Sequence, residues 1–253
     1  MGNPVYADGW SNPQTASQDD IPRDEGTRSF QPNEQPSIAS AAPLKRAAEQ
    51  YSLTRGTWKN LPGTAREVIA VAKSFGASDK GSATVDVFTG ADASEPKMHS
   101  MQAQGKLKDY KYLLFSAHGY LAQNPSLSAL VLTQKGNPEG VDGYITAAKW
   151  PLYDIRSDLT VLSACDTGVG KTQAGEGVMG LPYALFIAGN KNTLLSLWPV
   201  DDDATAEFMS RFFAKLKAGQ VQPEALSQTK REFMQHAKWN APKYWAAFVL
   251  YGV

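Results

Sequence analysis

The chain has 253 residues, 25 of them basic and 25 acidic, so its formal net charge is zero. This length suits one large α/β domain or two small ones, and the zero net charge argues against a protein that binds nucleic acid by bulk electrostatic attraction. No stretch reaches the roughly 18 apolar residues of a membrane span and the polar start lacks the apolar core of a signal peptide, so we expect a cytoplasmic protein with no membrane partner.

Residues 11–43 differ in composition from the rest of the chain. They hold five of the 15 prolines among Ser, Gln, Asn and Asp, and their few apolar residues recur at no fixed period. This composition predicts a mobile loop or linker rather than a packed element. We therefore expect an N-terminal segment at residues 1–55 and one folded domain at residues 56–253.

The regular pattern begins with a helix at residues 64–76. Thr64 and Glu67 have the spacing of a capping box, in which each side chain satisfies a free backbone N–H of the first turn, and Gly76 is suited to end the helix. Residues 83–88 then alternate like a strand and close at Gly90. This region therefore predicts a helix followed by a short strand.

Four apolar stretches predict the main strands, at residues 110–117, 129–133, 159–164 and 193–198. Three helices and a final aromatic-rich strand or buried tail are expected, in that order, at residues 177–188, 205–216, 223–237 and 244–251. The first of these helices is apolar nearly all round, so we expect it to be buried. Apolar strands that alternate with helices favour an α/β fold with a mainly parallel sheet covered by helices on both faces.

Two of these strands end at side chains that carry chemistry, the first at His118 and the third at Cys165. Ligands bind at the carboxyl ends of parallel strands, so the two side chains meet at one edge of the sheet if their strands are parallel neighbours. An imidazole lowers the pKa of a nearby thiol; the thiolate attacks a carbonyl, and the imidazolium protonates the leaving amine. The backbone N–H groups of Gly119 and Cys165 are expected to stabilise the oxyanion.

Two other interpretations of this region remain open. Cys165, the one cysteine of the chain, is also compatible with an inert core residue, and His118 with a buried core histidine. Residues 170–172, Gly-Lys-Thr, resemble the end of a phosphate-binding loop, with Asp201 as the Walker B carboxylate. This nucleotide-binding alternative is weakened because Cys165 stands where the loop needs its first glycine, and glycines soon after Lys171 interrupt the helix that the loop requires.

Six segments in order resemble the CHAT peptidases, bacterial relatives of caspases and separase that are often fused to tetratricopeptide repeats. The resemblance covers about residues 56–253 and rests on LPGTAREVIAVAKSFG, KYLLFSAHGYL, the pair LSALVLT and DGYITAAKW, DLTVLSACDTGVG, GEGVMGLPYALFIAGNKNTLLSLWPVDDDAT and KYWAAFVLYG. It implies a caspase-hemoglobinase-like fold with Cys165 as nucleophile and His118 as general acid and base. Gly119 and the Cys165 N–H carry the oxyanion role in this resemblance.

Two departures from the family pattern accompany the resemblance. Family members usually have a β-strand just before a Gly-Asp/Asn-Pro turn, whereas Gly2-Asn3-Pro4 here follows Met1 directly. We therefore expect that strand to be missing, or to be supplied by another segment or chain. The family's repeats are not found in the sequence either, so we expect any regulatory protein or repeat domain to be separate.

Substrate preference is assigned to Ser163, Trp198, Asp201 and Asp202. The acidic run at residues 201–203 follows the strand that often lines the first substrate pocket in the family, so one of its carboxylates is expected to select a basic residue before the cut. The same acids are compatible with ordinary helix capping, and Trp198 is as compatible with the core as with a pocket wall. Related enzymes that cut after Arg or Lys often have Asp where this chain has Ser163.

The sequence as a whole predicts a cysteine endopeptidase that cleaves protein or peptide substrates through a thioester acyl-enzyme. The other histidines, His99 and His236, do not form a set of metal ligands with neighbouring residues, so we expect neither a catalytic metal nor a cofactor. An alternative from another functional class is a catalytically silent interaction scaffold with the same caspase-like fold.

Overall fold

A six-stranded sheet forms the centre of the protein. The computed structural model describes residues 1–4, 58, 60–120, 122, 124–163 and 176–252. The strand order in the sheet is β11-β10-β9-β5-β1-β4. The bounds of its strands in chain order are β1 Gly2–Pro4, β4 Thr89–Gly90, β5 Tyr112–Ser116, β9 Leu159–Ser163, β10 Asn192–Ser196 and β11 Phe248–Gly252.

Every neighbouring pair in this sheet is parallel except β10 and β11, which run antiparallel. The central strands β5, β9 and β10 consist almost entirely of residues that are buried or half-buried, as expected where both faces of a parallel sheet are covered. The prediction of an α/β fold with a mainly parallel sheet is therefore confirmed.

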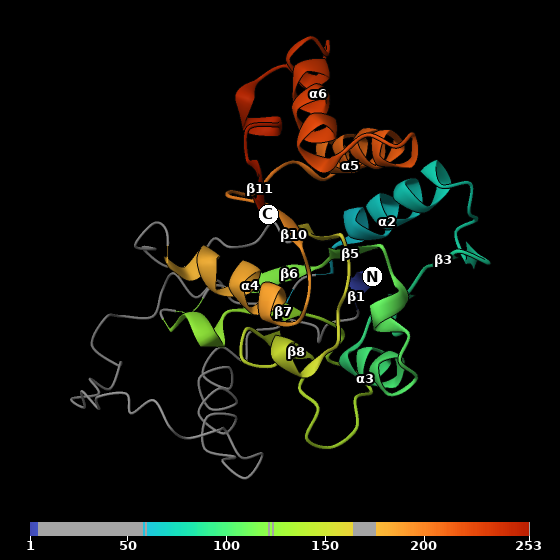
Figure 1. Cartoon of the computed structure of the whole chain (residues 1–253), viewed down its shortest axis with the longest axis vertical. Helices are drawn as coiled ribbons and strands as arrows, with labels where there is room; N and C mark the ends of the chain where they lie inside the picture. Colours follow the sequence, from blue (N-terminus) through green and yellow to red (C-terminus); the bar gives the residue numbers. More distant parts are fainter. Residues whose placement is uncertain (5–57, 59, 121, 123, 164–175, 253) are drawn as a thin grey trace.

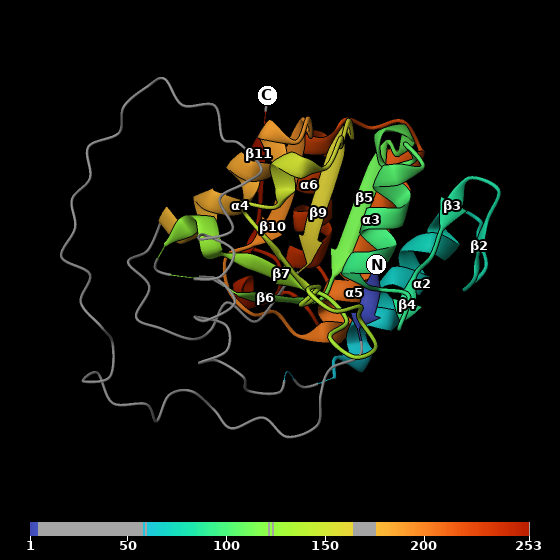
Figure 2. The same ribbon diagram turned by 90° about the horizontal axis from the view of Figure 1, so that it is seen from below.

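Helices lie on both faces of the sheet (Figures 1 and 2). One face packs against α2, α5 and α6, and the other against α3 and α4. The helix bounds are α2 Pro62–Ser74, α3 Glu95–Ala103, α4 Glu176–Ile187, α5 Asp202–Lys217 and α6 Gln222–Met234. Short 3-10 helices occur at Leu107–Asp109, Pro125–Leu127, Trp150–Leu152 and Pro242–Tyr244. No helix in the described part of the chain is long and apolar enough to cross a membrane.

A second, three-stranded antiparallel sheet follows β5. It has the order β6-β7-β8 and the bounds β6 His118–Tyr120, β7 Ala129–Val131 and β8 Tyr144–Thr146. A small hairpin of β2 Gly81–Ser82 and β3 Val85–Asp86 lies apart from both sheets. The strand expected at residues 83–88 is therefore wrong in extent, because the chain turns at residues 83–84 and only two residues on each side pair.

The capping box expected at Thr64 and Glu67 is wrong. Helix α2 begins two residues earlier, at Pro62, which fits the first turn because it needs no N–H partner. The Thr64 hydroxyl donates to the carbonyl of Leu61 at 2.7 Å, and Glu67 points into the protein, where it is 3% exposed. A local spacing rule fails here because distant partners compete for the carboxylate.

The expected all-round burial of the helix at residues 177–188 is also wrong. Leu181, Ala184 and Leu185 of α4 are buried, but Tyr183 and Phe186 are 66% and 56% exposed. A helix that covers one face of a sheet buries only the stripe facing that sheet, whatever the composition of its other side.

Residues 2–4, from which no strand was expected, form β1 between β5 and β4. Gly2 pairs with Ser116 and with Thr89, so the chain begins inside the sheet (Figure 2). The strand that the family pattern places before Gly2 is a separate expectation, which β1 does not test. The loop predicted at residues 11–43 and the boundary predicted at residue 55 lie outside the described residues.

Candidate active site

The two strands that lead to the predicted catalytic residues are parallel neighbours. Strand β5 pairs with β9 from Tyr112 opposite Leu159 to Ser116 opposite Ser163. The sequence analysis required parallel, neighbouring strands to bring His118 and Cys165 to one edge of the sheet, and β5 and β9 meet this requirement. Cys165 itself lies outside the described residues, as does Lys171 of the alternative phosphate-binding loop.

His118 is the first residue of β6 and is 2% exposed. Its ring lies 4.9 Å from the ring of Trp58, with 37° between the two planes. The indole N–H of Trp58 donates to the hydroxyl of Tyr144 at 2.9 Å, which fixes the position of the indole. Trp58 and Tyr144 therefore restrict the imidazole through packing. Neither was predicted as a site residue, because neither has a motif of its own.

Gly119 follows His118 in β6, and its backbone N–H points away from β7. The Leu132 N–H donates to the carbonyl of Gly143 at 2.8 Å, so Leu132 and, two residues earlier, Leu130 direct their backbone groups toward β8. Antiparallel pairing alternates, so Gly119, which stands opposite Leu130, is a non-hydrogen-bonded position of the β6–β7 ladder. The geometry thus leaves this N–H on the side away from β7, as an oxyanion donor requires.

Glu67 is buried beside the ends of β5 and β9. Its Oε2 accepts hydrogen bonds from the hydroxyls of Ser116 and Ser163, the latter at 3.0 Å. Burial raises the pKa of Glu67 to about 7, although the two serine hydrogen bonds and the positive charge of the Met1 amine lower it. The Glu67 carboxyl therefore joins β5 to β9 through one serine of each strand. Each of these serines stands two residues before a predicted catalytic residue.

The sequence analysis assigned Glu67 to the end of a helix and so missed this role. The signal available was the serine that stands two residues before both His118 and Cys165. Serines in register on adjacent parallel strands lie on the same sheet face, where one buried acceptor satisfies both hydroxyls. Ser163, predicted to contact substrate, uses its hydroxyl in this way and is 3% exposed.

The three acids at the start of α5 have different surroundings. Asp201 is the N-cap and accepts from the backbone N–H groups of Asp203 and Ala204 at 3.0 and 3.1 Å. Asp203 forms an exposed ion pair with Arg66 at 3.1 Å. These contacts agree with the capping interpretation for Asp201.

Asp202 instead faces the start of α2, where a Cβ placed on Gly63 would lie 2.1 Å from its Oδ2. Burial raises the pKa of Asp202, and the positive charge of Arg66 and the nearby His118 lower it. Asp202 therefore lies within electrostatic range of His118. Trp198, also predicted for the pocket, is 38% exposed and donates its indole N–H to the carbonyl of Lys243 at 3.1 Å.

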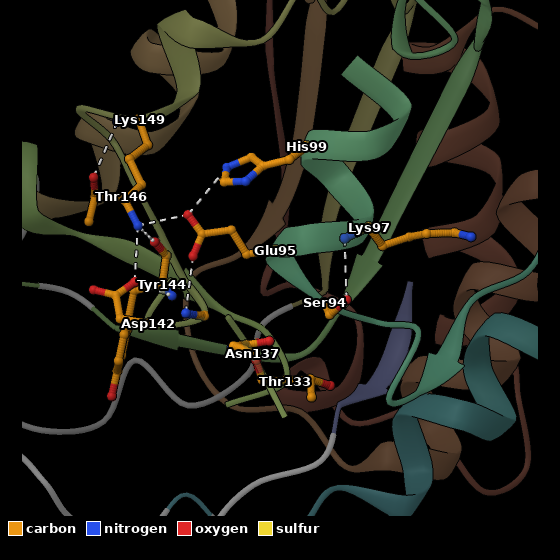
Figure 3. A network of polar contacts seen from close by, with 11 residues as sticks. Ser94, Glu95, Lys97, His99, Thr133, Asn137, Asp142, Tyr144, Thr146 and Lys149 are labelled. Carbon is orange, nitrogen blue, oxygen red and sulfur yellow. Dashed lines mark hydrogen bonds and ion pairs between the residues drawn. The ribbon is translucent and has the colours of Figure 1, made fainter. Parts of the chain in front are cut away.

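A buried ionic network supports the small sheet from the side of α3 (Figure 3). The Glu95 carboxylate accepts from the ammonium of Lys149 at 2.7 Å and from the backbone N–H of Gly143 at 3.0 Å. Lys149 also donates to the carbonyl of Tyr144 at 2.8 Å. The network therefore joins α3 to β8, whose Tyr144 holds the indole beside His118.

We expect Lys149→Met to lower the free energy of unfolding by about 3 kcal/mol, because Glu95 keeps a buried charge without its cation. The Glu95 and Lys149 side chains are 2% and 16% exposed. Lys191→Met is the matched control: Lys191 is 61% exposed in its ion pair with Asp158, so its loss should cost less than about 1 kcal/mol. Urea unfolding of the three proteins gives the comparison, and equal losses would contradict the structural role of Lys149.

The described residues hold no group of three or more His, Cys, Asp or Glu side chains arranged to bind a metal ion. His99 lies 3.7 Å from Glu95 and stacks on Tyr153. His236 accepts from the backbone N–H groups of Lys238 and Trp239 at the end of α6. Both histidines therefore make contacts that serve the fold.

Comparison with known proteins finds one family and two relatives. The family model for the CHAT domain matches residues 12–253. Tetratricopeptide repeat protein 28 of Homo sapiens is 32% identical over 108 residues, which are 43% of this chain and 4% of that protein. The protein of the same name in Mus musculus is 31% identical over 110 residues, 43% of this chain and 4% of that protein. The chain thus matches only a small part of the length of these curated relatives.

Proposed function

We propose that this chain, which belongs to the CHAT domain family of caspase-like peptidases, is a cysteine endopeptidase acting through Cys165 and His118. The observation that carries the proposal is the pairing of Ser116 opposite Ser163 in adjacent parallel strands. Each serine stands two residues before one member of the dyad, which supports a common position for both at the carboxyl edge of the sheet. We propose for the same reason that the strands have the caspase-hemoglobinase arrangement.

In the proposed reaction His118 takes the proton of the Cys165 thiol, and the thiolate sulfur attacks the carbonyl carbon of the scissile peptide bond. The tetrahedral oxyanion is stabilised by the N–H groups of Gly119 and Cys165. The C–N bond breaks as the imidazolium protonates the leaving amine. Water, deprotonated by His118, then hydrolyses the thioester, and the thiol regains its proton.

The surroundings of His118 support this role. Trp58 packs against the imidazole ring, and a ring held on one side loses less rotational freedom when the reacting groups align. The backbone N–H of Gly119 points away from β7, as the oxyanion role needs. Among the three acids, Asp202 is the candidate for selecting a basic residue before the cut, because Asp201 caps α5 and Asp203 pairs with Arg66.

The names of the two relatives include tetratricopeptide repeats. This supports the proposal that a repeat domain or a separate repeat protein controls the peptidase.

The test is cleavage of a diverse peptide library by the whole chain, before and after alkylation of Cys165 with iodoacetamide. We expect cleavage that disappears on alkylation, and an excess of Arg or Lys before the cut if Asp202 lines the pocket. Cleavage that survives alkylation would contradict the cysteine mechanism.

If no peptide is cleaved and Cys165 is alkylated only as slowly as an ordinary free thiol, the silent scaffold is favoured. In that case a nucleotide-dependent rise in melting temperature that is lost in Lys171→Ala would favour the phosphate-binding loop.

A further inference from the structure

A buried carboxyl group lies against the ends of the two strands that lead to the proposed dyad. The Oε2 atom of Glu67 accepts hydrogen bonds from the hydroxyls of Ser116, the last residue of β5, and Ser163, the last residue of β9. All three side chains are buried. Because one oxygen accepts from both hydroxyls, it fixes the distance between the carboxyl ends of the two strands.

Helix α2 holds this carboxyl group in place. Val71, one turn after Glu67, packs into the same apolar cluster as Phe208 and Phe212 of α5. The two strand ends are thus tied to a packed helix, and a packed helix positions a site more precisely than a loop does.

The packing of α2 on the sheet does not require a carboxyl group at this position. The second carboxyl oxygen of Glu67, Oε1, is buried and makes no hydrogen bond within the described part of the chain. Burying a carboxyl with an unpaired oxygen costs free energy, and an apolar side chain of similar volume is often as stable or more stable. The Glu67 carboxyl therefore needs an explanation other than packing.

We propose that Glu67 is a positioning residue of the peptidase site, which sets where β5 places His118 and where β9 places the nucleophile. One residue separates Ser116 from His118, and one separates Ser163 from Cys165, so the two Cα atoms of each pair are at most about 7 Å apart. Because a displacement of about 1 Å can lower a rate about 100-fold, hydrogen bonds this close to the dyad affect the rate. This role rests on the proposed function, and in it Glu67 acts only through the two serines.

The experiment compares four variants of the whole chain with the wild type. Glu67→Met keeps the length of the side chain and removes the acceptor, whereas Glu67→Gln keeps an oxygen for the two serines. Ser116→Ala removes one hydroxyl, and it tests the role even if Glu67→Met fails to fold. Ser157→Ala is the matched control, because Ser157 is also a buried serine that donates to one side-chain oxygen, Oδ1 of Asn190 at 2.8 Å, but precedes the opposite end of β9.

The first measurement is of kcat and KM on the best library peptide. We expect Glu67→Met to lower kcat about 100-fold with little change in KM, and Ser116→Ala to lower kcat by a smaller factor. Glu67→Gln and Ser157→Ala are expected to keep most of the wild-type kcat. Rescue by glutamine separates the hydrogen-bonding role from packing, because both replacements of Glu67 change the packing.

The second measurement, by proton NMR, does not depend on peptidase activity. The chain has three histidines, so comparison with His118→Ala identifies the imidazole signals of His118. The ring of Trp58, 4.9 Å away, makes these signals sensitive to the position of the imidazole. We expect Glu67→Met and Ser116→Ala to move them at least twice as far as Ser157→Ala does, and Glu67→Gln to leave them near their wild-type positions.

The two measurements separate this role from the function on which it rests. If the wild type cleaves peptides and Glu67→Met and Ser116→Ala keep its kcat, the positioning role is wrong and the peptidase assignment stands. A loss of kcat in Ser157→Ala as large as that in Ser116→Ala would also overturn the role.

If the wild type cleaves no peptide, the peptidase assignment fails, and the NMR signals decide whether Glu67 places His118. The expected pattern of shifts would support that placement, and unchanged signals in all variants would overturn it.

Discussion

Cys165→Ala is expected to abolish peptide cleavage, with a loss in kcat/KM of about 10⁴-fold or more, while the protein stays folded. Alanine lacks the sulfur that forms the acyl-enzyme, so the reaction loses its covalent path rather than part of its rate. The measurement is the initial rate on the best library peptide, together with circular dichroism and the melting temperature of both proteins. Cleavage at the wild-type rate by Cys165→Ala would disprove the assignment of the nucleophile.

His118→Ala is expected to lose activity to a similar extent, and the double variant should lose little more than either single one. Residues that act in one proton-transfer unit have non-additive effects. His99→Ala is the matched control, because His99 is half exposed beside Glu95 and takes no part in the proposed site. If His99→Ala and His118→Ala lose equal activity, the effect belongs to the fold and not to an acid–base role of His118.

The second large effect concerns the buried Glu67 and the pH dependence of stability. The folded protein raises the pKa of this carboxyl from 4.5 to about 7, mainly through burial. A carboxyl whose pKa is raised on folding stabilises the protein fully below its unfolded pKa, and this stabilisation is lost as pH rises through the folded pKa. The contribution of Glu67 therefore falls between about pH 4.5 and pH 7.

The Met1 amine acts in the opposite direction. Its pKa falls from 8.0 to about 5 on folding, through burial, so its contribution is present above pH 8 and is lost as pH falls toward 5. Over the range that the two groups share, their effects largely cancel in the wild-type protein. A variant that removes the carboxyl and keeps the amine in place is needed to observe Glu67.

Glu67→Gln provides that comparison, because the amide keeps an oxygen to accept from Ser116 and Ser163 and never ionises. We expect the free energy of unfolding of Glu67→Gln, relative to wild type, to rise by about 3 kcal/mol between pH 4.5 and pH 7.5. Urea unfolding at the two pH values measures this change. Glu139→Gln is the control at an exposed position, and its relative stability should stay constant. A constant difference for Glu67→Gln as well would show that the buried carboxyl does not titrate in this range.

The main elements could be predicted because each depends on neighbouring residues. The apolar stretches at residues 110–117, 159–164 and 193–198 correspond to β5, β9 and β10, and the stripe of α5 buries Phe208 and Phe212 as expected. Whether a segment forms a helix or a strand depends largely on the spacing of its apolar residues over about ten to twenty positions. The prediction of a mainly parallel sheet followed from the alternation of these elements.

The predictions that were wrong involve partners far away in the sequence. Thr64 and Glu67 satisfy a local capping rule, but the hydroxyls that bind the Glu67 carboxyl belong to residues 49 and 96 positions away. Residues 2–4 contain no strand pattern and become β1 because β5 and β4 offer backbone partners on either side. The apolar composition of α4 does not reveal which of its sides meets the sheet.

The sequence by itself determined the main strands and helices, the family and the identity of the two side chains proposed for catalysis, since all of these lie in short segments. Only the tertiary structure decided that Ser116 and Ser163 share the Glu67 carboxyl and that Trp58 packs on His118. Each of these features brings together groups that are distant in the chain. Burial then changes the energy of their charged and hydrogen-bonding side chains, and no local pattern encodes that environment.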